Sequence, residues 1–173
     1  MEQKTIDDYE AMMREKRATW PSGPWDDEPN RVQWKTRTGL DALMVRNHMG
    51  AWCGYVGVPP GHPLHGVQYN DAYDVLDTDV HGGLTYSDAC AEHICHIPAP
   101  GEPDALWWLG FDCAHSGDLL PGMLVHAWLQ HASYRTQAYV RDHCERLAES
   151  IAAAVAAVAP TEPAPAVDGA DRV

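Results

Sequence analysis

Residues 105–112 read Ala105-Leu106-Trp107-Trp108-Leu109-Gly110-Phe111-Asp112, a run that is apolar on both faces of an extended chain. Successive residues of a strand point to opposite faces of its sheet, so a run of this kind needs cover on both sides. The run therefore predicts a buried strand, with other elements packed above and below its sheet.

Further strand signals surround this run. β-Branched and aromatic residues between Gly and Asn breaks predict an antiparallel meander from three segments, 32–36, 40–46 and 51–58. Residues 47–50 have the composition of one of its turns. Residues 79–86 predict another strand, interrupted by a bulge or turn at Gly82-Gly83. Residues 69–77 look like a turn-rich linker.

Two segments have helical periodicity. Residues 4–18 predict a short charged helix, and the apolar residues from Ser133 to Val158 predict a longer one, with Ser133 as its N-cap. The expected fold class is α+β, with a small, mostly antiparallel sheet packed against one long C-terminal helix and a peripheral N-terminal helix.

The chain is short enough for one domain. Residues 1–31 are expected to form the peripheral helix and a Pro/Gly-rich acidic loop, and residues 32–159 a single α+β domain. The composition of residues 160–173 is that of a disordered tail.

The charge of the chain is strongly negative. The 173 residues carry a formal net charge of −13, which excludes a general nucleic-acid binder held by phosphate neutralisation. No Lys or Arg lies between Arg46 and Arg135, so a phosphate ligand would need these residues or Arg141. An acidic protein can instead mimic the charge of DNA and occupy a basic channel on another protein.

The sequence also suggests a location. It contains neither the apolar run of roughly 20 residues that a membrane helix needs nor the start of a signal peptide, which predicts a cytoplasmic protein without membrane contact. Five cysteines, an odd number, favour reduced thiols over a disulfide framework.

Asp112, His115 and Asp118 follow the apolar run within a Gly-containing turn. With His81 from the other Gly-rich strand they would form a His/Asp set suited to zinc, manganese or iron. Such a metal could activate water for hydrolysis, and Asp112, His115 and Asp118 are then the candidate catalytic residues. The alternative is that these residues cap turns and hydrogen-bond within a tight loop, because the spacing matches no specific metal motif.

Two other groups of residues are candidates. Cys90, His93, Cys95 and His96 are potential zinc ligands, but structural zinc sites usually draw pairs from two separated segments, so packing is favoured here. A flat ligand such as a base could stack on aromatic side chains. The candidate ligand-binding residues are Trp52, Tyr55, His62, Trp107, Trp108 and Arg135. At sheet positions, aromatic residues are more often part of the core.

Four blocks of the sequence stand out, residues 52–63, 79–85, 107–118 and 134–136. Together they resemble a family of small proteins encoded by bacteriophages and prophages, and the resemblance covers roughly residues 34–150. It implies no established activity, but it does imply a setting, the infected bacterial cell. Small accessory phage proteins of this kind often act against host defences.

Three classes of function remain open. The first is a binding protein directed at a host defence protein, either an acidic inhibitor of a nucleic-acid-binding effector or a homo-oligomer that traps a nucleotide signal. The second is a metal-dependent hydrolase that uses the His/Asp set, and the third is a structural protein. The charge favours the inhibitor, whose activity would depend on surface carboxylates such as Asp71, Asp74 and Asp77.

Overall fold

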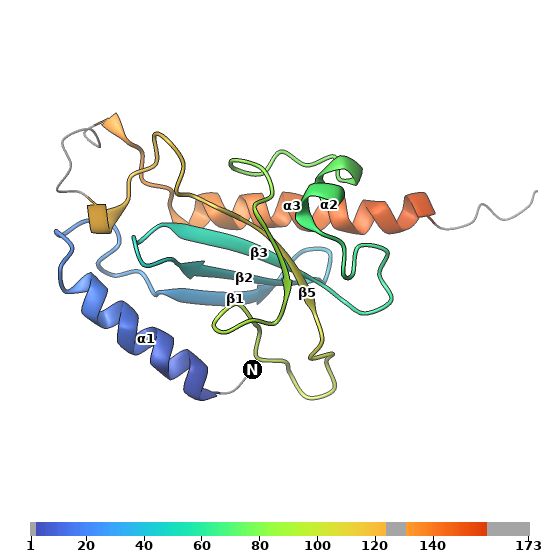
Figure 1. Cartoon of the computed structure of the whole chain (residues 1–173), viewed down its shortest axis with the longest axis horizontal. Coiled ribbons are helices and arrows are strands. Elements are labelled where there is room, and N and C mark those ends of the chain that lie inside the picture. The colour runs from blue at the N-terminus through green and yellow to red at the C-terminus, as the bar shows by residue number, and fades with distance from the viewer. Residues whose placement is uncertain (1–2, 124–130, 159–173) are drawn as a thin grey trace, which may run out of the picture.

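The computed structural model describes residues 3–123 and 131–158. Within them the protein has an α+β fold with a five-stranded antiparallel sheet and three α-helices (Figure 1), which confirms the expected class. In chain order the elements are α1 Gln3–Arg17, β1 Arg31–Lys35, β2 Asp41–Arg46, β3 Trp52–Val58, α2 Tyr69–Val75, β4 Tyr86–Ala89, β5 Trp107–Asp112, the 3-10 helix η1 Pro121–Met123 and α3 Gln137–Val158.

The strand order is β1-β2-β3-β5-β4, and each neighbouring pair is antiparallel. Strands β1, β2 and β3 form the predicted meander. Strand β5, the apolar run of residues 105–112, pairs with β3 on one side and with β4 on the other. This apolar strand therefore lies inside the sheet, as its sequence predicts.

Successive residues of the inner strands belong to two different core clusters. On β2, Met44 belongs to the first cluster, whereas Leu43 and Val45 belong to the second. On β5, Leu109 belongs to the first cluster and Trp108 to the second. Side chains of α3 complete the first cluster, and these are Val140, Cys144, Leu147, Ala148, Ile151 and Ala154. Tyr9 and Met13 of α1 belong to the second.

Gly54 of β3 lies in close contact with α3. A Cβ at this position would lie 2.7 Å from Cys144 Sγ and 2.6 Å from Phe111 Cζ, so any larger residue would force the helix or the phenyl ring to move. The absence of a side chain at Gly54 thus sets how closely α3 approaches β3.

The N-terminus of α3 differs from the prediction. The helix begins at Gln137, and the Tyr139 N–H donates a 3.3 Å hydrogen bond to Thr136 Oγ1, so Thr136 is the capping residue. Ser133 instead joins the loop after β5, because its N–H donates to Gly117 O and its carbonyl accepts from the Leu119 N–H. Ser133 has the right side chain for a cap, but its backbone is already paired.

Two other predictions are corrected. Residues 69–75 form the helix α2 rather than a linker. The strand predicted at 79–86 is mostly a turn, closed by a hydrogen bond from the Gly83 N–H to Val80 O, and β4 begins only at Tyr86. The tail predicted at 160–173 lies outside the described residues. None of the helices in the described ranges combines the length and apolar character that crossing a membrane requires.

Candidate functional site

The four predicted metal-site residues lie near one another as two pairs, His81 with Asp118 and His115 with Asp112, but they are not a group of potential ligands found within 4.8 Å of one another in the described residues. His81 comes from the turn before β4, and Asp112, His115 and Asp118 lie at and after the end of β5. The ring centroids of His81 and His115 are 5.4 Å apart, and His81 Nε2 lies 2.7 Å from Asp118 Oδ2. His115 Nε2 lies 3.7 Å from Asp112 Oδ1. His81 therefore lies near three residues that follow it by 31 or more positions in the sequence.

Asp118 is the hub of this site. Only 2% of the residue is exposed, and its carboxylate accepts three hydrogen bonds. Arg135 Nε donates to Oδ1 at 2.7 Å, and Oδ2 accepts from His81 Nε2 at 2.7 Å and from the His115 N–H at 3.0 Å. Burial would raise the pKa of Asp118, but the hydrogen bonds from Arg135, His81 and His115 outweigh it and leave this pKa below its ordinary value.

These contacts fix how His81 is oriented. A carboxylate can only accept, so His81 Nε2 carries the proton that it donates to Asp118. His81 Nδ1 lies 3.0 Å from the Tyr139 hydroxyl. The His81 backbone N–H donates to His143 Nδ1 at 3.1 Å, so that nitrogen of His143 is unprotonated. Burial, and then Arg146 and His81, lower the pKa of His143, which keeps its ring neutral.

Tyr139 and His143 were not among the predicted site residues. They lie four residues apart, on one face near the start of α3, and Arg135 precedes the helix by two residues. The Arg135 guanidinium lies 5.0 Å from the centre of the Tyr139 ring. The spacing of four residues between Arg135, Tyr139 and His143 was a signal that could have identified them.

Gly82 is required for this packing. Its φ is +70°, and a Cβ there would lie 2.0 Å from His115 Nε2. The turn before β4 can therefore lie against the His115 ring only because residue 82 has no side chain.

Most of the atoms that would bind a metal at this site are already engaged, but His115 Nε2 is buried and has no hydrogen-bond partner. Asp118 uses both oxygens and His81 both nitrogens, so an ion would have to displace Arg135 or Tyr139. Asp112 also behaves as a turn cap, because its Oδ1 accepts from the Ala114 N–H at 2.9 Å. The arrangement is a hydrogen-bonded network that joins the His81 turn, the loop after β5 and α3.

The six predicted ligand-binding residues do not gather around one pocket. Trp52 and Trp108 have no exposed surface and Tyr55 is 6% exposed, so no base can stack on them. His62 and Trp107 each hydrogen-bond to a backbone carbonyl. The sixth residue, Arg135, is engaged with Asp118.

The three arginines considered for a phosphate ligand each contact different side chains of the protein. Arg46 is fully buried, pairs with Glu28 and lies 4.1 Å over the Trp52 ring. Arg141 lies 4.3 Å over the ring of Trp34. With Arg135 held by the Asp118 carboxylate, no two of them form a cradle for a phosphate group.

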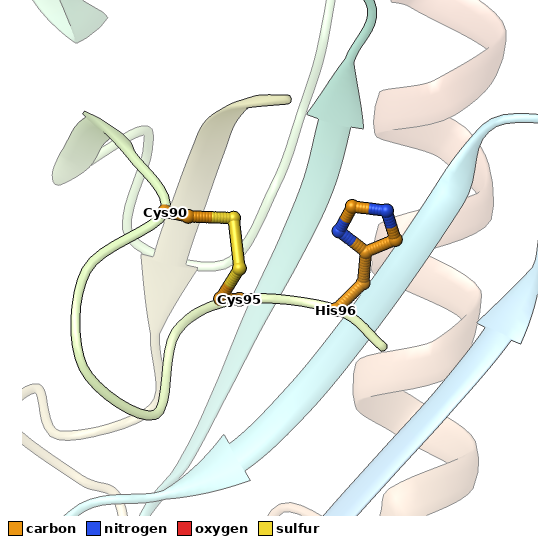
Figure 2. Close-up of side chains that lie close together, drawn as sticks. All are labelled: Cys90, Cys95 and His96. Atoms are coloured by element: carbon orange, nitrogen blue, oxygen red, sulfur yellow. A yellow bond between two sulfur atoms is a disulfide. The ribbon is translucent and has the colours of Figure 1, made fainter. Parts of the chain in front are cut away.

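The cysteine-rich segment corrects another expectation. Cys90 and Cys95 form a disulfide, as Figure 2 shows, so the prediction of reduced thiols is wrong for this pair. Cys53, Cys113 and Cys144 are free and buried, where burial raises the pKa of each thiol. In the part of the chain that the structure describes, Cys90, Cys95 and His96 are the potential metal ligands found within 4.8 Å of one another.

A different kind of surface lies on α2 and the segment that follows it. Four exposed carboxylates and two exposed apolar side chains form what we call the acidic α2 face: Asp71, Tyr73, Asp74, Val75, Asp77 and Asp79. Tyr73 is 50% exposed and Val75 is 62% exposed. An open hollow of about 540 Å³ lies beside Tyr73, Asp74 and Asp79. A second hollow, of about 370 Å³, lies beside Val75 and Asp77.

Comparisons with known proteins do not place this chain. No family model matches it, and neither a curated protein nor a solved structure matches it. Any functional conclusion must therefore come from its own residues.

Proposed function

We propose that this is a binding protein whose acidic α2 face docks on a basic surface of a partner protein, a surface that otherwise holds nucleic acid. The proposal is carried by one observation. Among the large apolar side chains exposed in the described ranges, Tyr73 and Val75 are the two most exposed, and the segment that carries them, residues 71–79, also has four exposed carboxylates.

The two kinds of side chain have complementary effects on binding. An exposed Tyr and Val lose contact with water when a partner covers them, and interface energy is usually concentrated in a few such anchors. The carboxylates attract a basic partner and orient it during encounter, an effect that raises the rate of association. Asp71, Asp74 and Asp77 form no ion pair with another described residue, so their charges are available to a partner.

The other form of the binding hypothesis has less support. A protein that traps a nucleotide needs cations for the phosphates and an open aromatic surface for the base. Arg46 and Arg135 are held by Glu28 and Asp118, and Trp52 is buried. We therefore favour the acidic inhibitor over the nucleotide trap.

The resemblance to phage proteins supplies the setting of the proposal. In it the protein is made in the host bacterial cytoplasm, and its partner is a nucleic-acid-binding protein of host defence. The chain is then an anti-defence factor, which occupies the DNA or RNA channel of that effector by mimicking the charge of the nucleic acid.

The experiment is a competition assay against purified bacterial defence nucleases. Each nuclease is bound to a fluorescent DNA duplex, and the displacement of DNA by the protein is followed as anisotropy. We expect displacement from at least one nuclease, with an affinity that falls as salt is raised. The triple variant Asp71→Lys, Asp74→Lys and Asp77→Lys should lose at least about tenfold in affinity, or roughly 1.4 kcal/mol.

A matched control separates the acidic α2 face from net charge. The variant Asp8→Lys, Glu15→Lys and Asp27→Lys changes three exposed carboxylates elsewhere and has the same net charge. It should keep most of the affinity. Equal losses of affinity in the two variants would mean that overall charge, and not the acidic α2 face, determines binding. Failure to displace DNA from any nuclease would count against the proposal.

A metal-dependent hydrolase is the second candidate, because His81 contacts Asp118, His115 lies near Asp112, and the buried His115 Nε2 has no hydrogen-bond partner. It requires an ion to replace Arg135 or Tyr139 at the Asp118 hub. The test is metal content by elemental mass spectrometry for the wild type and for His115→Ala. Stoichiometric metal that disappears in the variant would favour the hydrolase, and equal metal-free spectra would eliminate it.

A further inference from the structure

We propose that Cys90, Cys95 and His96 form a zinc site when the Cys90–Cys95 disulfide is reduced. Their ligand atoms, two sulfurs and one ring nitrogen, already lie within 4.8 Å of one another. Two thiolates and one imidazole are ligands that zinc prefers. The site is distinct from the acidic α2 face, and the inference does not depend on the proposed function.

The backbone holds the two cysteines together independently of the disulfide. Ala91 and Ile94 exchange two hydrogen bonds, of 3.1 and 2.9 Å, around the turn at Glu92 and His93. The cysteines flank this closed turn, with their Cα atoms 4.6 Å apart. Because the turn is held by main-chain bonds, reduction leaves both sulfurs on the same side of the same turn.

The Cys95 end of this turn is also anchored to β1. Arg31 donates a hydrogen bond of 2.6 Å to Cys95 O, and the Gln33 side chain pairs with both the N–H and the carbonyl of Ile97. His96 lies between these two anchors. Two of the three ligands are thus fixed on the sheet, and Cys90, the exposed one, can adjust to an ion.

His96 is the observation that points to a ligand. The residue is completely buried, and its Nε2 lies 3.0 Å from Pro103 O. A carbonyl can only accept, so Nε2 carries the proton and Nδ1 has a free lone pair. Nδ1 is buried and has no hydrogen-bond partner in the structure. Figure 2 shows this nitrogen on the side of the ring that faces the disulfide.

A buried lone pair without a donor destabilises the fold, and a bound cation would remove this cost. The carbonyl of Pro103 then takes the usual place of an outer-shell group, since it orients the imidazole through its other nitrogen. Three protein ligands leave the fourth position of a tetrahedral zinc ion open to water.

Disulfide reduction and zinc binding conserve atoms and electrons when a phosphine is the reductant. The disulfide takes two electrons from the phosphine, and water supplies the oxygen of the phosphine oxide and the two protons of the new thiols. Zinc then replaces these two protons, so each ion bound releases two protons to the solvent. The exposed position of Cys90 gives the reductant access to the bond.

The test uses cobalt(II) as a spectroscopic substitute for zinc, added to the full-length protein before and after reduction with the phosphine. We expect the reduced protein to bind one cobalt per chain, with a thiolate-to-cobalt charge-transfer band, and zinc to displace it. The oxidised protein should bind none at this site. Cys90→Ser changes an exposed residue, so it should fold normally and lose the band.

Three further variants make the assignment specific. His96→Ala should weaken binding by more than the roughly 10- to 100-fold that is typical of losing an outer-shell group. His93→Gln removes an imidazole from the same turn that is not in the ligand group, and it should keep the band. The double variant Cys90→Ser and Cys95→Ser retains the three buried thiols and reports any contribution from them. A reduced protein without the band, or a band that survives in Cys90→Ser, would overturn the proposal.

Discussion

Replacing Asp118 by Asn tests the network that joins the His81 turn to α3. The change keeps the shape of the side chain but removes the charge. It also replaces one acceptor oxygen by an NH2 group, which then faces another hydrogen-bond donor. Asp118 accepts from Arg135, His81 and the His115 N–H, all within 3.0 Å. His81 can shift its proton to Nδ1, and the Arg135 side chain is 30% exposed and can hydrogen-bond to water. Part of the lost free energy of unfolding is therefore recovered.

The loss of at least one charge-assisted bond at a buried site gives an expected destabilisation of about 3 kcal/mol. For a chain of this size it corresponds to a fall of about 6–12 °C in the melting temperature. The assay is urea unfolding followed by tryptophan fluorescence.

The control is Asp142→Asn, which breaks an exposed pair with Arg146 on α3 and should cost less than about 0.5 kcal/mol. The reasoning is refuted if Asp118→Asn unfolds at the same urea concentration as this control, because the buried carboxylate would then not be a structural hub.

Two further predictions concern the same site. The hydrogen bonds of Asp118 outweigh its burial and leave its pKa below the ordinary 3.8, so its carboxylate stabilises the fold above that value, and the contribution disappears as the pH falls through and below it. The unfolding free-energy difference between wild type and Asp118→Asn should therefore narrow from about pH 5 to about pH 3, and a constant difference in urea titrations would contradict this. Gly82→Ala should be at least about 1 kcal/mol more destabilising than Gly117→Ala, because both have positive φ but only at residue 82 would the new Cβ meet the His115 ring. Equal melting temperatures would mean that His115 moves aside without cost.

The sequence predicted the sheet well because its strands have strong signals. The apolar run of β5 could be stable only inside a sheet covered on both faces. The helix α2 was missed because its seven residues carry Asn and Asp, which are weak helix formers, and only Ala72 within it is buried. Its conformation comes from tertiary packing, which no local pattern records.

The candidate site was predicted in part for a similar reason. The convergence of His81 with Asp118 was proposed because His81 lies on a Gly-rich predicted strand and Asp118 in the Gly-containing turn after another strand. The sequence could not indicate that Arg135, just before α3, and Tyr139, within it, contact Asp118 and His81, because this depends on how the helix packs on the sheet. The disulfide was missed because an odd number of cysteines does not exclude one local pair.

The most direct test of the docking proposal is site-specific photo-crosslinking in bacterial cells that produce the protein. A photoreactive phenylalanine analogue replaces Tyr73 on the acidic α2 face or, as a control, Ile97, which is exposed elsewhere and is 47% accessible. We expect residue 73 to crosslink to a nucleic-acid-binding protein, the control to give no such product, and added DNA to suppress the crosslink in a lysate. Equal crosslinking from both positions, or a product that DNA does not suppress, would contradict the assignment of this face as a mimic of nucleic acid.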